Sequence, residues 1–178
     1  MGGDTPGYAV VPPSGFVASL EESGLIVEVG RWVSAAVGEQ IRGWSRRGIE
    51  PVQVSVNVSE RQLVRGDLEG DVMLALDLYE VPARLLELEM TETVLMTGTD
   101  HTIAILANLK AAGVQISIDD FGKGYSSLAY LRRFPINKLK IDRSLILDVA
   151  RSPEAAAMAL SIIRMGHGLN LEVVAQGV

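Results

Sequence analysis

The chain has 178 residues, of which 48% are hydrophobic and 21% are charged, and its formal net charge is -6 at pH 7. This composition predicts one globular domain with a sizeable core; it excludes a disordered chain and disfavours a nucleic-acid polymer as partner. The chain has no cysteine, no apolar run long enough to span a membrane and no secretory pattern at its start, so we expect a location in the cytoplasm.

Strands and helices are expected to alternate along the chain. Residues 1–10 are a lead-in segment rich in glycine and proline, and residues 11–178 form one domain. Apolar residues at helical spacing predict helices at 16–22, 28–47, 63–79, 102–112, 128–133 and 153–168. Alternating β-branched and apolar residues predict strands at 52–58, 85–90, 114–119, 138–141 and 171–175.

This order of elements predicts an α/β fold with parallel strands joined by right-handed helical crossovers. Asp100 is expected to cap the helix at 102–112. Trp32 and Trp44 lie at helical spacing and are expected in the core. His101 and His167 have no partner at metal-binding spacing, so we interpret both as structural.

The stretch 114–128 is the one around which the other elements are organised. A buried strand ends in two adjacent carboxylates, Asp119 and Asp120, and a glycine-containing loop follows. The repulsion between the two charges is best compensated by a divalent cation, because hard cations bind carboxylate oxygens. Alternatively, one Asp caps the next turn and the other is solvated. Ser126 is expected to cap the helix that follows the loop.

Polar residues end each of the five predicted strands. In an α/β fold the carboxyl ends of the strands share one rim, where ligands bind. Oxygen ligands of this kind suit Mg²⁺ or Mn²⁺, and a lysine beside them could hold a phosphate oxygen or a metal-bound water. The pattern predicts a divalent-metal phosphate site made of Asn57, Glu89, Asp119, Asp120, Lys140 and Gln176.

Glu92 follows the second strand, in a segment that we expect to be a loop. Two interpretations of this carboxylate stay open. It could bind backbone N–H groups of the glycine loop at 121–127, or it could be an ordinary carboxylate at the start of a helix, favoured by the helix dipole.

Several motifs along the chain match one known family. They are Val56-Asn57-Val58-Ser59-Glu60-Arg61-Gln62, Leu88-Glu89-Met90-Thr91-Glu92, Asp119-Asp120-Phe121-Gly122-Lys123-Gly124-Tyr125-Ser126-Ser127-Leu128, Leu139-Lys140-Ile141-Asp142-Arg143-Ser144 and Val173-Val174-Ala175-Gln176-Gly177-Val178. On these residues, and on matches from about residue 11 onward, the chain resembles the EAL domain. This family comprises bacterial phosphodiesterase domains that hydrolyse cyclic di-GMP.

The resemblance implies a TIM-type β/α barrel and metal-dependent hydrolysis of cyclic di-GMP to linear pGpG. It implies that Asn57, Glu89 and Asp119 bind one Mg²⁺ or Mn²⁺, and that Asp119 and Asp120 share a second. By the same resemblance, Lys140 holds the attacking water or a phosphate oxygen, and Glu92 stabilises the loop after Asp120. Expected partners are cyclic di-GMP, a second copy in a homodimer, and a sensory or diguanylate-cyclase domain.

The chain departs from the family pattern in ways that predict impaired catalysis. The strand with the Glu-Ala-Leu signature is absent and the chain ends before the last strand of the family, so we expect an incomplete barrel of about five parallel strands. Gln176 stands where the family has Glu, and a neutral amide cannot act as a base. Lys123 replaces a small Thr or Ser. The alternative function is a non-catalytic module that binds cyclic di-GMP or a protein partner.

Overall fold

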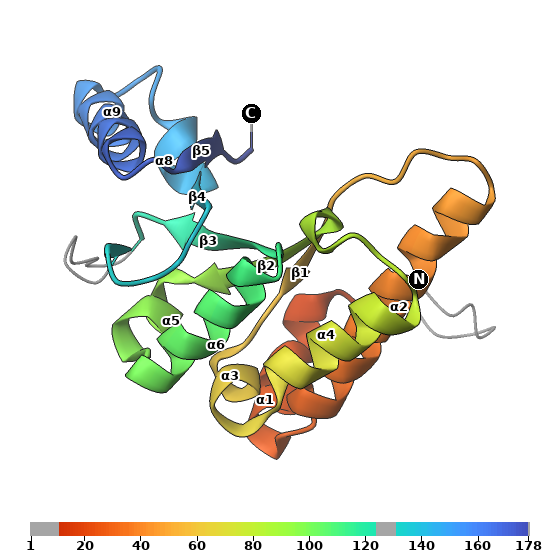
Figure 1. Cartoon of the computed structure of the whole chain (residues 1–178). Coiled ribbons are helices and arrows are strands. Elements are labelled where there is room, and N and C mark those ends of the chain that lie inside the picture. Colours follow the sequence, from red (N-terminus) through yellow and green to blue (C-terminus); the bar gives the residue numbers. More distant parts are fainter. Residues whose placement is uncertain (1–10, 124–130, 178) are drawn as a thin grey trace.

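The computed structural model describes residues 11–123 and 131–177. Within these residues the chain forms one sheet of five parallel strands, in the order β1-β2-β3-β4-β5 (Figure 1). The strands are β1 (Val54–Asn57), β2 (Leu86–Thr91), β3 (Gln115–Phe121), β4 (Lys138–Ile141) and β5 (Glu172–Ala175). This sheet confirms the expected α/β fold with about five parallel strands. The expected cap Ser126 and the start of the predicted helix at 128–133 lie outside the described residues.

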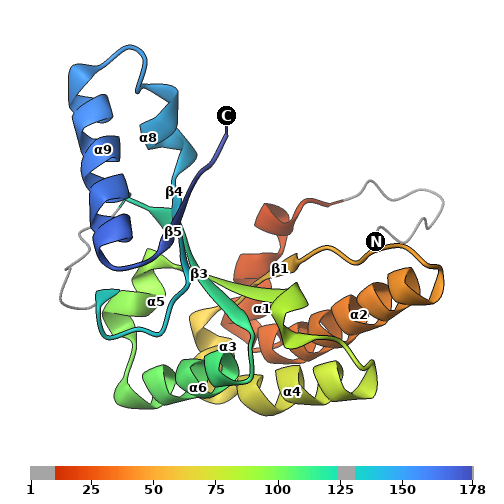
Figure 2. The same cartoon turned by 45° about the horizontal axis from the view of Figure 1, so that its top comes forward.

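The helices pack along one side of the curved sheet (Figures 1 and 2). Helix α2 contacts β1, α6 contacts β3, and α9 contacts β4 and β5. The helical elements are η1 (Pro13–Gly15), α1 (Val17–Ser23), α2 (Ile26–Arg46), α3 (Glu60–Arg65), α4 (Leu68–Leu78), η2 (Ala83–Leu85), α5 (Glu92–Thr97), α6 (Asp100–Ala111), α8 (Arg143–Leu147) and α9 (Pro153–Gly168). In the part of the chain that the structure describes, no helix is long and apolar enough to cross a bilayer.

The two faces of the sheet differ in chemistry because side chains alternate along each strand. The face that meets the helices is apolar, and its central residues are fully buried: Leu88, Ile116, Ile118, Leu139 and Ile141. The opposite face, which we call the inner face, is polar. The strand register brings together on it Ser55, Asn57, Glu87, Glu89, Ser117, Asp119, Lys138 and Lys140. The sheet therefore presents its polar residues away from the helices.

Most predicted helices agree with the structure to within a few residues, and α5 and α8 were not predicted. Two differences arise from helix caps. The helix predicted at 63–79 is two helices, α3 and α4, because the Asp67 side chain accepts a hydrogen bond from the Gly70 N–H at 3.0 Å and starts a new helix. The expected cap Asp100 is instead the first residue of α6, and Thr99 caps that helix by accepting from the Thr102 N–H at 3.3 Å.

The tryptophans differ in burial. Trp44 packs against the core as expected. The prediction for Trp32 is wrong, because this side chain is 63% exposed on α2. A stripe at helical spacing shows which side of a helix is apolar, but it does not show how far the neighbouring elements cover that side.

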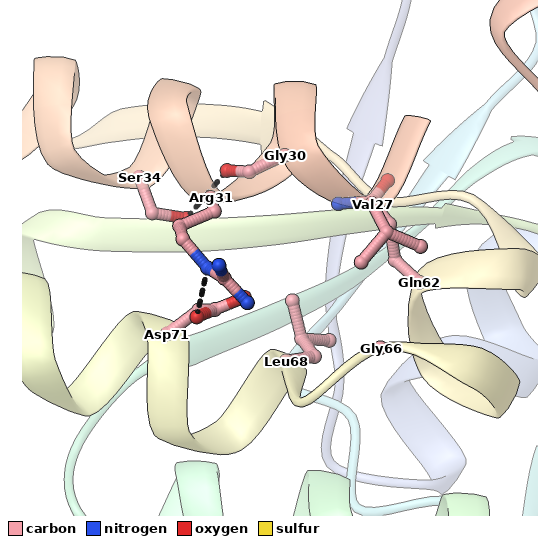
Figure 3. A pocket seen from close by; sticks show the side chains of 8 residues that line it. All are labelled: Val27, Gly30, Arg31, Ser34, Gln62, Gly66, Leu68 and Asp71. Carbon is pink, nitrogen blue, oxygen red and sulfur yellow. Dashed lines mark hydrogen bonds and ion pairs between the residues drawn. The ribbon is translucent and has the colours of Figure 1, made fainter. Parts of the chain in front are cut away.

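A small pocket lies between α2, α3 and α4 (Figure 3). The Arg31 Nε atom donates a hydrogen bond to Asp71 Oδ1 at 2.7 Å across it, and the Ser34 hydroxyl donates to the Gly30 carbonyl. Because its polar groups bond to one another, we interpret this pocket as part of the helix packing.

Candidate functional site

The predicted metal ligands come from three adjacent strands on the inner face. Asn57 at the end of β1 is paired in register with Glu89 of β2. Asp119 of β3 is paired with Thr91, so it lies one side-chain layer beyond Glu89 on the same face. Glu89 is buried and Asp119 is half-buried, whereas Asn57 is exposed. The parallel register therefore gathers an amide and two carboxylates at the carboxyl ends of the strands.

Lys140 enters this group from β4. Its Nζ atom donates to the Glu89 carboxylate and also contacts Glu87 Oε1 at 2.9 Å. Burial alone would lower the pKa of Lys140, but the hydrogen bonds to Glu89 and Glu87 raise it. Lys140 is therefore an ammonium that is shared between two carboxylates.

Glu87 is a residue of the site that the sequence analysis did not single out. Its side chain is 1% exposed, and Oε2 accepts from Lys138 Nζ at 2.6 Å. Oε1 accepts from the hydroxyls of Ser117 at 3.0 Å and Ser55 at 3.2 Å. Burial would raise its pKa, but the hydrogen bonds from Lys138 and Lys140 lower it to about 2. The available signal was its position two residues before Glu89, which places both carboxylates on one face.

Gln176 contacts the candidate ligand set directly. Its backbone N–H donates to the Ile141 carbonyl at 3.2 Å, which continues the pairing just past β5. Its side-chain Nε2 donates to Asp119 Oδ1 at 2.7 Å. One oxygen of Asp119 is thus bound by an amide N–H, a contact that a carboxylate at this position could not make.

Asp120 points to a different set of partners from Asp119. A register shift between Ile118 and Phe121 and a positive φ of 55° at Asp120 turn the strand end, so two adjacent residues no longer simply alternate. Lys123 Nζ lies 3.1 Å from Asp120 Oδ1 and 2.8 Å from Asp142 Oδ2. Burial raises the pKa of Asp120, aided by Asp142 and Asp119 and opposed by Lys123.

Asp142 is the second residue that the sequence analysis missed. It caps α8, since its Oδ1 accepts from the Ser144 N–H at 2.8 Å. The hydrogen bond from Lys123, and then those from Ser144, hold the pKa of Asp142 well below its usual range. A cap before a helix start is visible in sequence, but the contact with Lys123 requires the fold.

Glu92 fits both of the interpretations that the sequence left open. It is not in a loop as expected: it is the first residue of α5. Its Oε2 also accepts from the Gly122 N–H at 3.2 Å, at the start of the glycine loop. Because Gly122 has a φ of 102°, it takes a conformation that other residues rarely adopt. Glu92 therefore connects the end of β2 to the turn after Asp120.

The donor set fits a hard divalent cation. Asn57, Glu89 and Asp119 offer amide and carboxylate oxygens, which Mg²⁺ and Mn²⁺ prefer. In the described part of the chain, no three or more His, Cys, Asp or Glu residues are already gathered around one point as a metal site. One oxygen of Glu89 is bonded to Lys140, and one oxygen of Asp119 is bonded to Gln176. A cation that binds these two oxygens would compete with the two side chains.

Comparisons with known proteins agree with this geometry. The family model described as EAL domain matches residues 3–178. The cyclic di-GMP phosphodiesterase NbdA of Pseudomonas aeruginosa is 42% identical over 173 residues, which cover 97% of this chain and 22% of that protein. The chain spans about a fifth to a quarter of the length of the curated relatives that it matches, from 20% to 26%.

Solved EAL structures have the same fold. The MucR phosphodiesterase of Pseudomonas aeruginosa in complex with cyclic di-GMP is 40% identical, with a TM-score of 0.89 over 98% of this chain and 71% of that chain. BlrP1 of Klebsiella pneumoniae, in a complex with calcium and cyclic di-GMP, is 31% identical, with a TM-score of 0.70 over 85% of this chain and 37% of that chain. The expected TIM type of α/β fold is confirmed by these neighbours.

Proposed function

Because the chain belongs to the EAL domain family of cyclic di-GMP phosphodiesterases, we propose that it binds cyclic di-GMP with a divalent cation at the inner face. The choice of ligand is supported by the MucR structure, which contains cyclic di-GMP and is 40% identical in sequence to this chain. The family is metal-dependent, and the oxygen donors of this chain favour Mg²⁺ or Mn²⁺.

The proposed roles follow the contacts of the site. Asn57, Glu89 and Asp119 would hold one cation, and Asp120 would share a second with Asp119. A divalent cation at such a site neutralises phosphate charge and makes a bound water a better nucleophile. Lys140 would direct its ammonium at a phosphate oxygen or the attacking water, and Glu92 would keep the turn at Gly122 in place through its hydrogen bond.

We propose further that hydrolysis by this site is impaired, and the contact between Gln176 and Asp119 is the observation that carries this proposal. The amide donates to one of the two Asp119 oxygens that could bind a cation. It also cannot accept a proton from water, as the family Glu at this position could. The site would thus bind the dinucleotide while cleaving it slowly, if at all.

The experiment compares the wild-type protein with Gln176→Glu. Calorimetry in Mg²⁺ measures binding of cyclic di-GMP, and chromatography measures linear pGpG. We expect both proteins to bind the dinucleotide and Gln176→Glu to form pGpG at least about tenfold faster. Equal rates would refute impairment by Gln176. Failure of both proteins to bind would refute the ligand assignment.

The proposal also includes a partner domain, a homodimer and a location in the cytoplasm. The multidomain relatives include a bifunctional diguanylate cyclase and phosphodiesterase, which supports a sensory or cyclase domain as the partner of this unit. A homodimer and a cytoplasmic location remain predictions from the sequence. Sedimentation with and without cyclic di-GMP would test the dimer.

A further inference from the structure

A buried ionic cluster lies beside the candidate site on the inner face. We call it the Glu87 cluster, and its members are Glu87, Ser55, Ser117, Lys138 and Lys140. The inward layers of β/α barrels are normally filled by bulky branched residues. Here the side chain of Glu87 is 1% exposed and those of Lys138 and Lys140 are 16% and 14% exposed. A carboxylate with two ammonium groups at this depth carries a desolvation cost, so its presence calls for a physical reason.

Lys140 links the cluster to the proposed metal ligand. Its ammonium contacts Glu87 at 2.9 Å and is also hydrogen-bonded to Glu89. A cation on Glu89 would repel this ammonium and compete with it for the Glu89 carboxylate. A buried ammonium left without a carboxylate is strongly unfavourable, so Lys140 needs a second partner whenever Glu89 binds a cation.

Glu87 is built to be that partner. Its Oε1 is fixed by the hydroxyls of Ser55 and Ser117, and its Oε2 is neutralised by Lys138. These contacts hold the carboxylate in one place whether or not Glu89 moves. Among the described residues, Glu87 and Glu89 are the carboxylates that Lys140 contacts, so loss of Glu87 would leave Lys140 bound to Glu89 alone.

We propose that Glu87 is a positioning residue of the divalent-cation site: it retains the Lys140 ammonium on the inner face so that the Glu89 carboxylate can turn to the cation. The inference rests on the proposed function, because that function makes Glu89 a metal ligand. It adds a residue that acts on the site through Lys140. A chain without Glu87 would bind the cation in competition with its own lysine.

The test measures Mn²⁺ affinity by calorimetry in the absence of nucleotide. The double variant Glu87→Gln with Lys138→Met removes one negative and one positive charge, so the net charge of the cluster is unchanged. We expect it to bind Mn²⁺ about tenfold more weakly than wild type, the size typical for groups that orient metal ligands. In a Lys140→Met background, the same two substitutions should change the affinity by less than about twofold, because no ammonium then competes for Glu89.

Glu172→Gln is the matched control. Glu172 is the other carboxylate near Lys138, at 3.7 Å, and it is exposed and does not contact Lys140. This variant should bind Mn²⁺ like wild type. The proposal is overturned if the Glu87/Lys138 double variant also binds like wild type, or if its loss of affinity is equally large with and without Lys140.

A second readout is independent of metal binding, because it measures how accessible the Lys140 ammonium is in the metal-free protein. Acetylation of Lys140, followed by mass spectrometry, is measured in Glu89→Gln and in the double variant Glu87→Gln with Glu89→Gln. If Glu87 retains Lys140, the lysine stays protected in the single variant and reacts rapidly in the double variant. Equal reactivity in the two variants would overturn the proposal. If the wild-type protein binds no Mn²⁺ but Lys140 is protected in Glu89→Gln and not in the double variant, the proposed function alone is refuted.

Discussion

At the scale of single residues, the carboxylates of the site are satisfied by the chain's own donors. Lys140 binds Glu89, Gln176 binds Asp119, and Lys123 bridges Asp120 and Asp142. Each contact supplies positive charge or an N–H donor where a cation would otherwise sit. The affinity of the site for a cation is therefore a difference between two sets of partners. Substitutions of the donors test that difference as directly as substitutions of the ligands.

Asp142 combines a helix cap with an ion pair, and two variants separate these contributions. Asp142→Asn keeps a side chain that can cap α8 and should change the free energy of unfolding by no more than about 0.5 kcal/mol, since Lys123 is half-exposed. Asp142→Ala removes the cap as well and should cost about 1 kcal/mol or more. Urea unfolding measures both values. Equal losses in the two variants would mean that the cap contributes nothing.

At the scale of elements, local signals in the sequence placed the strands but not every helix boundary. The alternation of β-branched residues located all five strands of the sheet within a few residues. The helix predicted at 63–79 failed because apolar periodicity runs through Gly66 and Asp67 without a break, since α3 and α4 both pack on the same core. The cap at Asp67 was visible in sequence, but the continuous pattern outweighed it.

Asp67 provides a test of this break. Asp67→Ala removes the side chain that accepts from the Gly70 N–H, so one amide at the start of α4 loses its partner. We expect a loss of about 1 kcal/mol in the free energy of unfolding, with Asp67→Asn close to wild type. Urea titrations of wild type, Asp67→Ala and Asp67→Asn would measure the free energy of unfolding of each protein. Wild-type stability in Asp67→Ala would mean that packing alone defines the start of α4.

The residues of the candidate site near the strand ends could be predicted from the sequence, but the ion pair of Glu87 with Lys138 could not. Asn57, Glu89, Asp119, Lys140 and Gln176 each lie at or near the end of a predicted strand, so the sequence pattern alone grouped them. Glu87 meets Lys138 across 51 positions of the chain, and no local pattern links two such distant residues. The register of β2, β3 and β4 has to be known before this ion pair can be seen.

At the scale of the whole molecule, the sheet separates an apolar face under the helices from a charged inner face. The apolar face accounts for the core, and the charged face carries the candidate chemistry. Stability therefore depends on pH through the groups of the inner face. Glu87 is a buried group of this face whose pKa is lowered to about 2, so it should contribute to this dependence.

Acid should destabilise the metal-free protein through Glu87. Because its pKa in the folded protein is lowered from 4.5 to about 2, its contribution is complete above the unfolded pKa and is lost as the pH falls from about 4.5 towards 2. The loss over this window is about 3 kcal/mol. Unfolding by urea at several pH values should show this loss in wild type and not in Glu87→Gln. If the free energy of unfolding depended on pH equally in the two proteins, the loss could not be assigned to Glu87.

The central claim is that the polar inner face binds cyclic di-GMP with a divalent cation. The most direct measurement is a thermal melt of the protein with Mg²⁺, with and without the dinucleotide, beside a matched Asp119→Asn variant. Ligand at about 100 times its dissociation constant should stabilise the wild-type fold by about 2.7 kcal/mol and raise its melting temperature. Asp119→Asn should melt cooperatively with little or no shift. A cooperative wild-type melt that cyclic di-GMP leaves unchanged, or an equal shift in Asp119→Asn, would contradict the account.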